Sequence, residues 1–142
     1  MISYQRLTKA DIKQVVLLEE ELLQETLGIE MLESELNNPT VCFLTAKDNL
    51  KVVGYIGLYV YLDEGEILNF VVDESYQRQN IGSTLLNKVI EQYNLKKITL
   101  EVREHNQKAI NFYIKNNFKK VNIRKHYYKN GDNAIVMMKV IK

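Results

Sequence analysis

Apolar positions along the first third of the chain predict one short strand and two helices. A weak alternation over residues 2–7 indicates the strand. Thr8 and Asp11 then resemble a capping box. After them, apolar residues recur at helical spacing: Ile12, Val15, Val16, Leu18 and Leu22. A first helix is therefore expected from about residue 9 to residue 24, and a second, shorter one over residues 30–36.

Three β-rich segments follow and are joined by short polar turns. They cover residues 41–46, 51–62 and 66–72, and their order predicts an antiparallel meander. Leucines and valines at helical spacing then predict a helix over residues 81–92, and an alternating apolar run predicts a strand over residues 97–102. A strand, a crossover helix and a strand in this order make the strands on either side of the helix parallel.

The last third of the chain predicts one more helix and a hairpin. Asn106 is typical of a helix N-cap, and the helix should end near Asn117, which tolerates the left-handed conformation. Residues 118–124 and 134–141 are expected to pair as a hairpin. The full order is β-α-α-β-β-β-α-β-α-β-β. It predicts an α/β fold with a central mixed sheet of six or seven strands, helices on both faces, and a single domain over residues 1–142.

Composition narrows the class of protein. Nineteen Lys and Arg residues against eighteen Asp and Glu residues give a net charge of +1, which argues against a general nucleic-acid binder. The single cysteine, Cys42, lies in an apolar run and is expected to be buried. No secretory signal is visible, and no apolar run reaches the ~20 residues of a membrane span. A cytoplasmic protein without membrane or direct nucleic-acid partners is expected, as a monomer or weak dimer.

Charge is distributed unevenly along the chain. Seven glutamates crowd the first third: Glu19, Glu20, Glu21, Glu25, Glu30, Glu33 and Glu35. Solvated helix faces are the simpler interpretation of this cluster. The alternative is an acidic surface that receives a basic partner.

The polar loop between the strand over residues 66–72 and the helix over residues 81–92 predicts an anion site. The first N–H groups of a helix have no partner within the helix, and the positive end of the helix dipole points the same way. A phosphate can bind at such a turn without a lysine. The working hypothesis is a cofactor that carries a pyrophosphate.

Residues 77–82, with the sequence QRQNIG, resemble the acyl-CoA pyrophosphate motif Q/R-x-x-G-x-G/A of the GNAT N-acetyltransferase superfamily. The order of elements is also similar. Further blocks resemble the ribosomal-protein-alanine N-acetyltransferases within that superfamily: LEVREHN (100–106), AINFY (109–113), IRKHYY (123–128) and DNAIVM (132–137). This resemblance extends over the chain from about Val53 onward.

The resemblance implies an acetyl-CoA-dependent enzyme without a metal. Glu101 matches the general base and Tyr113 the general acid. Asn106 matches the residue that binds the pantetheine arm, and Tyr127 and Tyr128 match an aromatic pair on the side where the peptide enters. The backbone of the remaining matched residues is expected to bind acetyl-CoA: Phe70, Val71, Val72, Arg78, Gln79, Asn80, Ile81, Gly82 and Ser83.

Asn80 departs from the family pattern, which has glycine at this position. The backbone there must suit a residue with a Cβ atom or adopt a positive φ, which asparagine tolerates better than most residues. Without the resemblance, simpler roles are favoured for the matched residues: Tyr113 as a core aromatic, Glu101 as a polar strand position and Asn106 as a helix cap.

The leading prediction is transfer of an acetyl group from acetyl-CoA to the N-terminal α-amine of a protein, by direct attack in a ternary complex. By resemblance, that protein is a small-subunit ribosomal protein. An α-amine has a reference pKa of ~7.7–8.0 against ~10.4 for lysine, so a carboxylate such as Glu101 suits the terminal amine better. Two alternatives stay open: transfer to a small amine such as a polyamine or an amino acid, and a CoA-binding regulatory module without turnover.

Overall fold

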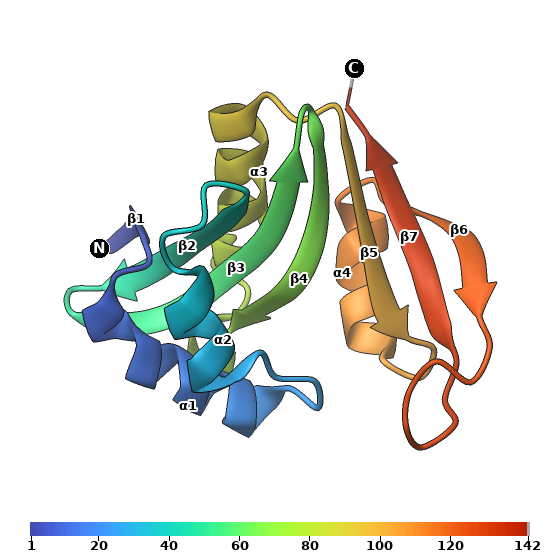
Figure 1. Cartoon of the computed structure of the whole chain (residues 1–142), viewed down its shortest axis with the longest axis horizontal. Helices are drawn as coiled ribbons and strands as arrows, with labels where there is room; N and C mark the ends of the chain where they lie inside the picture. Colours follow the sequence, from blue (N-terminus) through green and yellow to red (C-terminus); the bar gives the residue numbers. More distant parts are fainter. Residues whose placement is uncertain (142) are drawn as a thin grey trace.

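The computed structural model describes residues 1–141 and contains one mixed sheet of seven strands (Figure 1). The strands are β1 (Ile2–Arg6), β2 (Val41–Asp48), β3 (Lys51–Tyr61), β4 (Glu64–Val72), β5 (Lys97–Arg103), β6 (Lys119–Arg124) and β7 (Ala134–Val140). The α-helices are α1 (Ile12–Leu22), α2 (Gly28–Glu35), α3 (Ile81–Tyr93) and α4 (Gln107–Lys115). Two 3₁₀ turns, η1 (Lys9–Asp11) and η2 (Glu74–Tyr76), complete the order. The predicted order of helices and strands is confirmed.

The sheet runs in the order β1-β2-β3-β4-β5-β7-β6. Strands β1 to β4 pair antiparallel as the predicted meander, and β4 pairs with β5 in parallel. The final hairpin forms as expected, but its second strand, β7, lies between β5 and β6. This order was not predicted, because hydrophobic alternation identifies a strand without naming its neighbours.

Strands β4 and β5 pair only at their first residues. The pairs are Glu64 with Lys97, Gly65 with Ile98, and Glu66 with Thr99. Beyond these pairs the two strands diverge, as Figure 1 shows between β4 and β5. The β5-facing backbone of the rest of β4 therefore has no strand partner.

Helices cover both faces of the sheet, as the sequence predicts. Helices α1 and α2 pack on one face around a core that includes Leu7, Ile12, Val15, Leu18, Leu32, Phe43 and Tyr55. Helices α3 and α4 pack on the other face around a core that includes Leu85, Leu86, Val89, Ile98, Leu100, Ile110, Tyr113 and Met137. Cys42 is buried in this second core, as expected. No helix within residues 1–141 is long and apolar enough to cross a membrane.

The first helical segment begins as predicted and ends earlier than predicted. The backbone N–H of Thr8 donates to Asp11 Oδ2 at 3.0 Å, which forms the expected capping box. Helix α1 ends at Leu22 rather than at residue 24, because Leu23 is already extended. Helix α2 begins at Gly28, where φ is +85° and glycine is favoured.

A buried carboxylate sets these helix ends. Glu19 is 0% exposed, and its side chain accepts hydrogen bonds from the N–H groups of Leu27 (3.0 Å) and Gly28 (3.1 Å). It also accepts from the hydroxyl of Tyr55 and from Asn69 Nδ2. Glu19 therefore connects the loop of residues 23–27 with strands β3 and β4 through hydrogen bonds. Both interpretations of the glutamate cluster, a solvated helix face and an acidic surface, were wrong for Glu19, because its carboxylate is buried and hydrogen-bonded inside the fold.

Candidate functional site

Two cavities meet where β4 and β5 separate. The larger has a volume of about 850 Å³ and the smaller about 460 Å³. Six residues line both cavities: Leu22, Leu23, Phe70, Asn106, Ala109 and Tyr113. The cavities therefore form one continuous cleft, with the loop after α1 and the start of α4 around its middle.

The smaller cavity has free backbone donors along one side. Within residues 1–141, the N–H groups of residues 78–83 have no hydrogen-bond acceptor, and the first helical bond of α3 runs from the Thr84 N–H to the Asn80 carbonyl. Arg78 and Asn80 have φ values of 67° and 61°. Of the two alternatives that the sequence left open for Asn80, the structure therefore has the positive φ. A run of unpaired N–H groups at a helix N-terminus suits a phosphate group.

Close packing brings this turn against α4. A Cβ atom on Gly82 would lie only 3.0 Å from Cε1 of Phe112, so the close contact between the first turn of α3 and α4 favours glycine here. Phe112 in turn packs edge-on against Phe70 of β4, with ring centroids 5.4 Å apart. The site therefore rests on three elements whose contacts are fixed by these two aromatic rings.

Most of the predicted cofactor residues come together at the smaller cavity. The lining includes Phe70, Val71, Val72, Arg78, Asn80, Ile81, Gly82, Ser83 and Asn106. Gln79 does not line it, and the side chains of Val71 and Ile81 belong to the two cores. Only the backbone of Val71 and Ile81 can therefore face a ligand. The binding roles of all these residues stay predictions.

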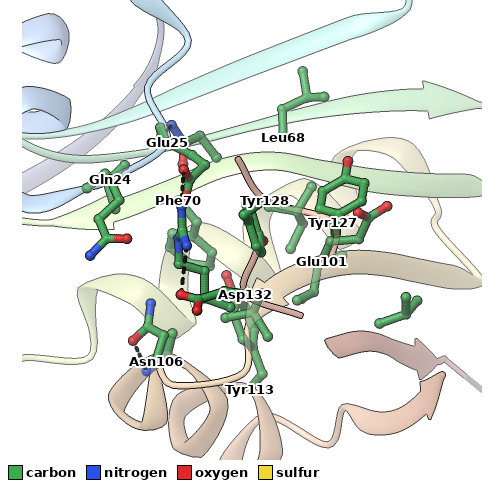
Figure 2. A pocket seen from close by; sticks show the side chains of 18 of the residues that line it. Gln24, Glu25, Leu68, Phe70, Glu101, Asn106, Tyr113, Tyr127, Tyr128 and Asp132 are labelled. Carbon is green, nitrogen blue, oxygen red and sulfur yellow. Dashed lines mark hydrogen bonds and ion pairs between the residues drawn. The ribbon is translucent and has the colours of Figure 1, made fainter. Parts of the chain in front are cut away.

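Asn106 caps α4, as the simpler interpretation of this residue predicted. Its Oδ1 accepts from the Ala109 N–H at 3.2 Å, which satisfies one of the free donors at the helix start. The side chain is exposed and borders both cavities (Figure 2). Because capping uses the oxygen, the amide nitrogen can still donate to a ligand.

Glu101 lines the larger cavity, and one of its carboxylate oxygens has no hydrogen-bond partner among residues 1–141. Its Oε2 is buried without a hydrogen-bond partner, whereas Oε1 lies 3.6 Å from Nη1 of Arg124. The negative charge of Glu101 contributes to raising the pKa of the nearby Tyr127 hydroxyl above its ordinary value. A buried carboxylate oxygen without a donor is costly. It can accept a proton or bind an ammonium group in the cleft.

Tyr113 lies at the junction of the two cavities. Its ring packs edge-on against Phe70, Phe112 and Phe118, at centroid distances of 6.3, 5.5 and 5.3 Å. Burial raises the pKa of Tyr113 well above its ordinary value, because the phenolate would lose its solvation. The hydroxyl therefore stays protonated and can act as a hydrogen-bond donor.

Tyr127 and Tyr128 form an edge-to-face pair beside Glu101, with centroids 5.1 Å apart (Figure 2). Both line the larger cavity. Burial raises the pKa of Tyr128 to about 12. The Arg103 guanidinium lies 4.1 Å from the centre of the Tyr128 ring. Whether this pair contacts a substrate stays a prediction.

Sequence reasoning missed an ionic network at the edge of the same cavity. Arg103 contacts both Glu25 and Asp132, at 2.7 and 3.0 Å. One signal was available for Arg103: it follows Glu101 by two positions on a strand, so both side chains lie on the same face. Nothing in the sequence indicated that Glu25 and Asp132, from distant loops, meet it.

Glu104, His105 and Asp132 bring possible metal-ligand atoms within 4.8 Å of one another. These groups are already engaged, however. Asp132 accepts from Arg103 and Asn130, and His105 Nε2 lies 3.2 Å from Glu104. We therefore assign no metal to this cluster.

The sequence and the structure of this chain are similar to those of known acetyltransferases. Residues 11–118 match the model of the acetyltransferase (GNAT) family. An N-alpha-acetyltransferase from Sulfurisphaera tokodaii is 32% identical, over 89% of this chain and 86% of its own length. The ribosomal protein bS18-alanine N-acetyltransferase of Escherichia coli is 36% identical over 63% of this chain and 64% of its own. A crystal structure of the E. coli ribosomal-protein-S18-alanine N-acetyltransferase superposes with a TM-score of 0.87 at 27% identity, covering 100% of this chain and 95% of that one.

Proposed function

Because this chain belongs to the acetyltransferase (GNAT) family and is an acyltransferase, we propose that it transfers an acetyl group from acetyl-CoA to the N-terminal α-amine of a protein. The observation that carries this proposal is Glu101. One of its carboxylate oxygens is buried and unpartnered in a cleft that continues into a cavity with free backbone donors. A proton acceptor and an anion site in one cleft are what acyl transfer to an amine requires.

The smaller cavity fits the phosphates of acetyl-CoA. The unpaired N–H groups of residues 78–83 match the acceptor-rich pyrophosphate, and the dipole of α3 adds to the attraction. Beyond the pyrophosphate, Phe70, Val72 and Asn106 line the way toward Tyr113. Bound there, acetyl-CoA supplies an acetyl group activated as a thioester.

The mechanism that we propose divides the proton transfers between two residues. Glu101 takes the proton from the acceptor ammonium, directly or through water, so that the neutral amine forms the C–N bond. Backbone N–H groups near Val71 and Val72 stabilise the negative charge on the carbonyl oxygen. As the C–S bond breaks, the second proton leaves the amine nitrogen and the departing sulfur gains a proton, so that the products are the amide and the CoA thiol; Tyr113 donates a hydrogen bond to the sulfur in this step. Because the two cavities share lining residues, sites for the cofactor and for the acceptor would adjoin, which supports direct attack in a ternary complex.

The acceptor that we propose is the N-terminus of a ribosomal protein. The E. coli relative is named for the alanine of ribosomal protein bS18, and the archaeal relative for α-amine acetylation. An α-amine is more easily deprotonated near neutral pH than a lysine side chain. The same proposal places the enzyme in the cytoplasm, where ribosomal proteins are made.

Matched peptides test this function. We expect acetyl transfer to peptides with a free N-terminus and none to the same peptides with a blocked N-terminus and an internal lysine. Glu101→Gln should lower kcat roughly 100-fold or more, with an unchanged Kd for acetyl-CoA. Glu64→Gln is the matched control, because Glu64 is half exposed and lines neither cavity.

Two outcomes would contradict the proposal. Transfer to the lysine of blocked peptides alone, or to small amines alone, would assign a different acceptor. Acetyl-CoA binding without turnover, unchanged by Glu101→Gln, would indicate a regulatory CoA-binding module. Mass spectrometry of the acceptors and calorimetry with acetyl-CoA distinguish these outcomes.

A further inference from the structure

Arg103 joins two loops that are distant in the sequence. Its Nε and Nη2 donate to the two carboxylate oxygens of Glu25, at 2.7 and 2.8 Å. Its Nη1 donates to Asn130 Oδ1 and to Asp132 Oδ2, both at 3.0 Å. Figure 2 shows these contacts as dashed lines that run from Glu25 to Asp132 beside Tyr128. We call this network the Arg103 bridge.

Each of the two loops forms part of the wall of the larger cavity. Glu25 belongs to residues 23–27, between α1 and α2, and Asp132 belongs to residues 125–133, between β6 and β7. Both residues line the cavity, as do Tyr127 and Tyr128 of the second loop. Within residues 1–141, no direct hydrogen bond or ion pair connects the loops, so their polar link runs through Arg103. The Arg103 bridge therefore sets the separation of these walls.

Hydrogen bonds from Asn69 of β4 also hold the first loop. Asn69 Nδ2 donates to the Glu25 carbonyl and to the buried carboxylate of Glu19, both at 3.0 Å. The backbone of this loop is thus attached to β4, while its side chain at Glu25 reaches the Arg103 bridge. The second loop has one backbone bond to the end of β5, from the Glu104 N–H to the Asn133 carbonyl at 3.1 Å.

The positive charge of Arg103 is already paired with the carboxylates of Glu25 and Asp132. Four of the five guanidinium N–H donors are used by Glu25, Asn130 and Asp132. The side chain is only 15% exposed, and its flat face stacks over Tyr128. Arg103 is therefore poorly placed to bind a phosphate of the cofactor or a carboxylate of the acceptor. Its bidentate contact and its stacking suit a role in holding geometry.

We propose that Arg103 is a positioning residue for the acceptor polypeptide: by joining the two loops it holds Tyr128 and the cleft walls in the arrangement that receives the peptide. This inference rests on the proposed function. Arg103 acts through Glu25 and Asp132, so its loss impairs acceptor binding and leaves the Glu101 chemistry and the acetyl-CoA site intact.

The test separates acceptor binding from catalysis. Arg103→Met should raise the KM for a free-N-terminus peptide roughly tenfold, with kcat and the Kd for acetyl-CoA within about twofold of the wild type. Arg103→Lys should rescue little, because lysine cannot form the bidentate contact. Lys97→Met is the matched control: it removes a cation and an ion pair from the other end of β5, outside both cavities.

Two further variants distinguish loss of the Arg103 bridge from a general loss of folding. Glu25 is 52% exposed, and Arg103 keeps Asp132 as a charged partner without it, so Glu25→Gln weakens the Arg103 bridge and should raise the same KM. The double variant Glu25→Gln with Arg103→Met should be no worse than Arg103→Met alone, because both act through one contact. Hydrogen exchange should increase in residues 23–27 and 125–133 together, and Tm confirms that each variant is folded.

The outcomes distinguish this inference from the proposed function. An unchanged peptide KM in Arg103→Met, or a loss confined to acetyl-CoA affinity, overturns the inference and leaves the proposed function standing. A wild-type enzyme that acetylates no free-N-terminus peptide overturns the proposed function, and the acceptor role of Arg103 with it. Additive effects of the Glu25 and Arg103 changes would show that Arg103 does not act through Glu25.

Discussion

At the scale of single residues, burial gives Glu101 and Tyr113 different chemical properties. Glu101 lines the cleft and has one carboxylate oxygen without a hydrogen-bond partner in the part of the chain that the structure describes. Tyr113 packs against three aromatic rings in an apolar core, and burial raises its pKa so that the hydroxyl stays protonated. The two residues therefore suit the proposed roles of base and hydrogen-bond donor.

The pH dependence of activity follows from these properties. We expect kcat/KM for a peptide to rise as the pH approaches the reference pKa of an α-amine, about 7.7–8.0. It should not fall again below pH 10, because the pKa of Tyr113 is raised above its ordinary value of 10.0. Tyr113→Phe should lower kcat roughly tenfold at every pH, whereas Tyr61→Phe, an exposed control, should not. A descending limb near pH 9 in the wild type would contradict this assignment.

Asn80 tests the cofactor turn at the same scale. Its φ of 61° suits glycine, so Asn80→Gly should leave acetyl-CoA binding unchanged or tighten it by up to roughly threefold. Asn94 at the other end of α3 has a φ of 50° and lines neither cavity, so Asn94→Gly is a control for the backbone effect alone. Calorimetry measures both. A clear loss of binding in Asn80→Gly alone would contradict the anion site.

At the scale of elements, the cleft exists because β4 and β5 pair at one end of the strands only. Strands β4 and β5 pair over their first residues and then diverge, while α3 and α4 close the far side. Glu19 and Arg103 hold the loop after α1 over the opening. The contact between α3 and α4 at Gly82 sets the distance of the cofactor turn from β4.

A single methyl group at Gly82 should disturb that contact. In Gly82→Ala the new Cβ atom would lie 3.0 and 3.1 Å from the Phe112 ring, so α3 or the ring must move. We expect a loss of about 1–2 kcal/mol in the free energy of unfolding and weaker acetyl-CoA binding. Asn87→Ala, on the exposed side of α3, is the control. Denaturant titration and calorimetry measure the two effects, and unchanged binding in Gly82→Ala would show that the turn is not part of the site.

At the scale of the whole molecule, the sheet separates two cores and the cleft lies near their border. One core lies under α1 and α2, and the other under α3 and α4. A ligand that bridges β4, α3 and α4 should therefore stabilise the whole fold and not only one loop.

Acetyl-CoA should raise the thermal stability of the protein. At about 100 times its Kd, a ligand specific for the native state adds about 2.7 kcal/mol, which corresponds to a rise in Tm of roughly 8 °C. Hydrogen exchange should slow most at residues 78–83, whose N–H groups are free in the absence of ligand. Free acetate is the negative control. An unchanged Tm with acetyl-CoA would contradict the proposed cofactor.

The order of elements and most of the candidate site could be predicted from the sequence. Hydrophobic periodicity located every helix and strand, because periods of 2 and 3.6 residues reflect which side of each element is buried. Asn106 and Asn117 were correctly placed at helix ends, since capping and the left-handed conformation depend on local side-chain chemistry. The family motif then directed attention to the turn after β4, where Asn80 has a positive φ, one of the two backbone alternatives that the sequence left open.

The tertiary structure alone decided what depends on distant residues. It placed β7 between β5 and β6, buried Glu19 in place of exposing it, and excluded Gln79 from the cavity lining. It also brought Glu25 and Asp132 to Arg103, from loops far away in the chain. Local sequence determines which residues favour a helix, a strand or a turn. Whether a charged side chain faces solvent or a partner depends on where the packed chain brings the other charges.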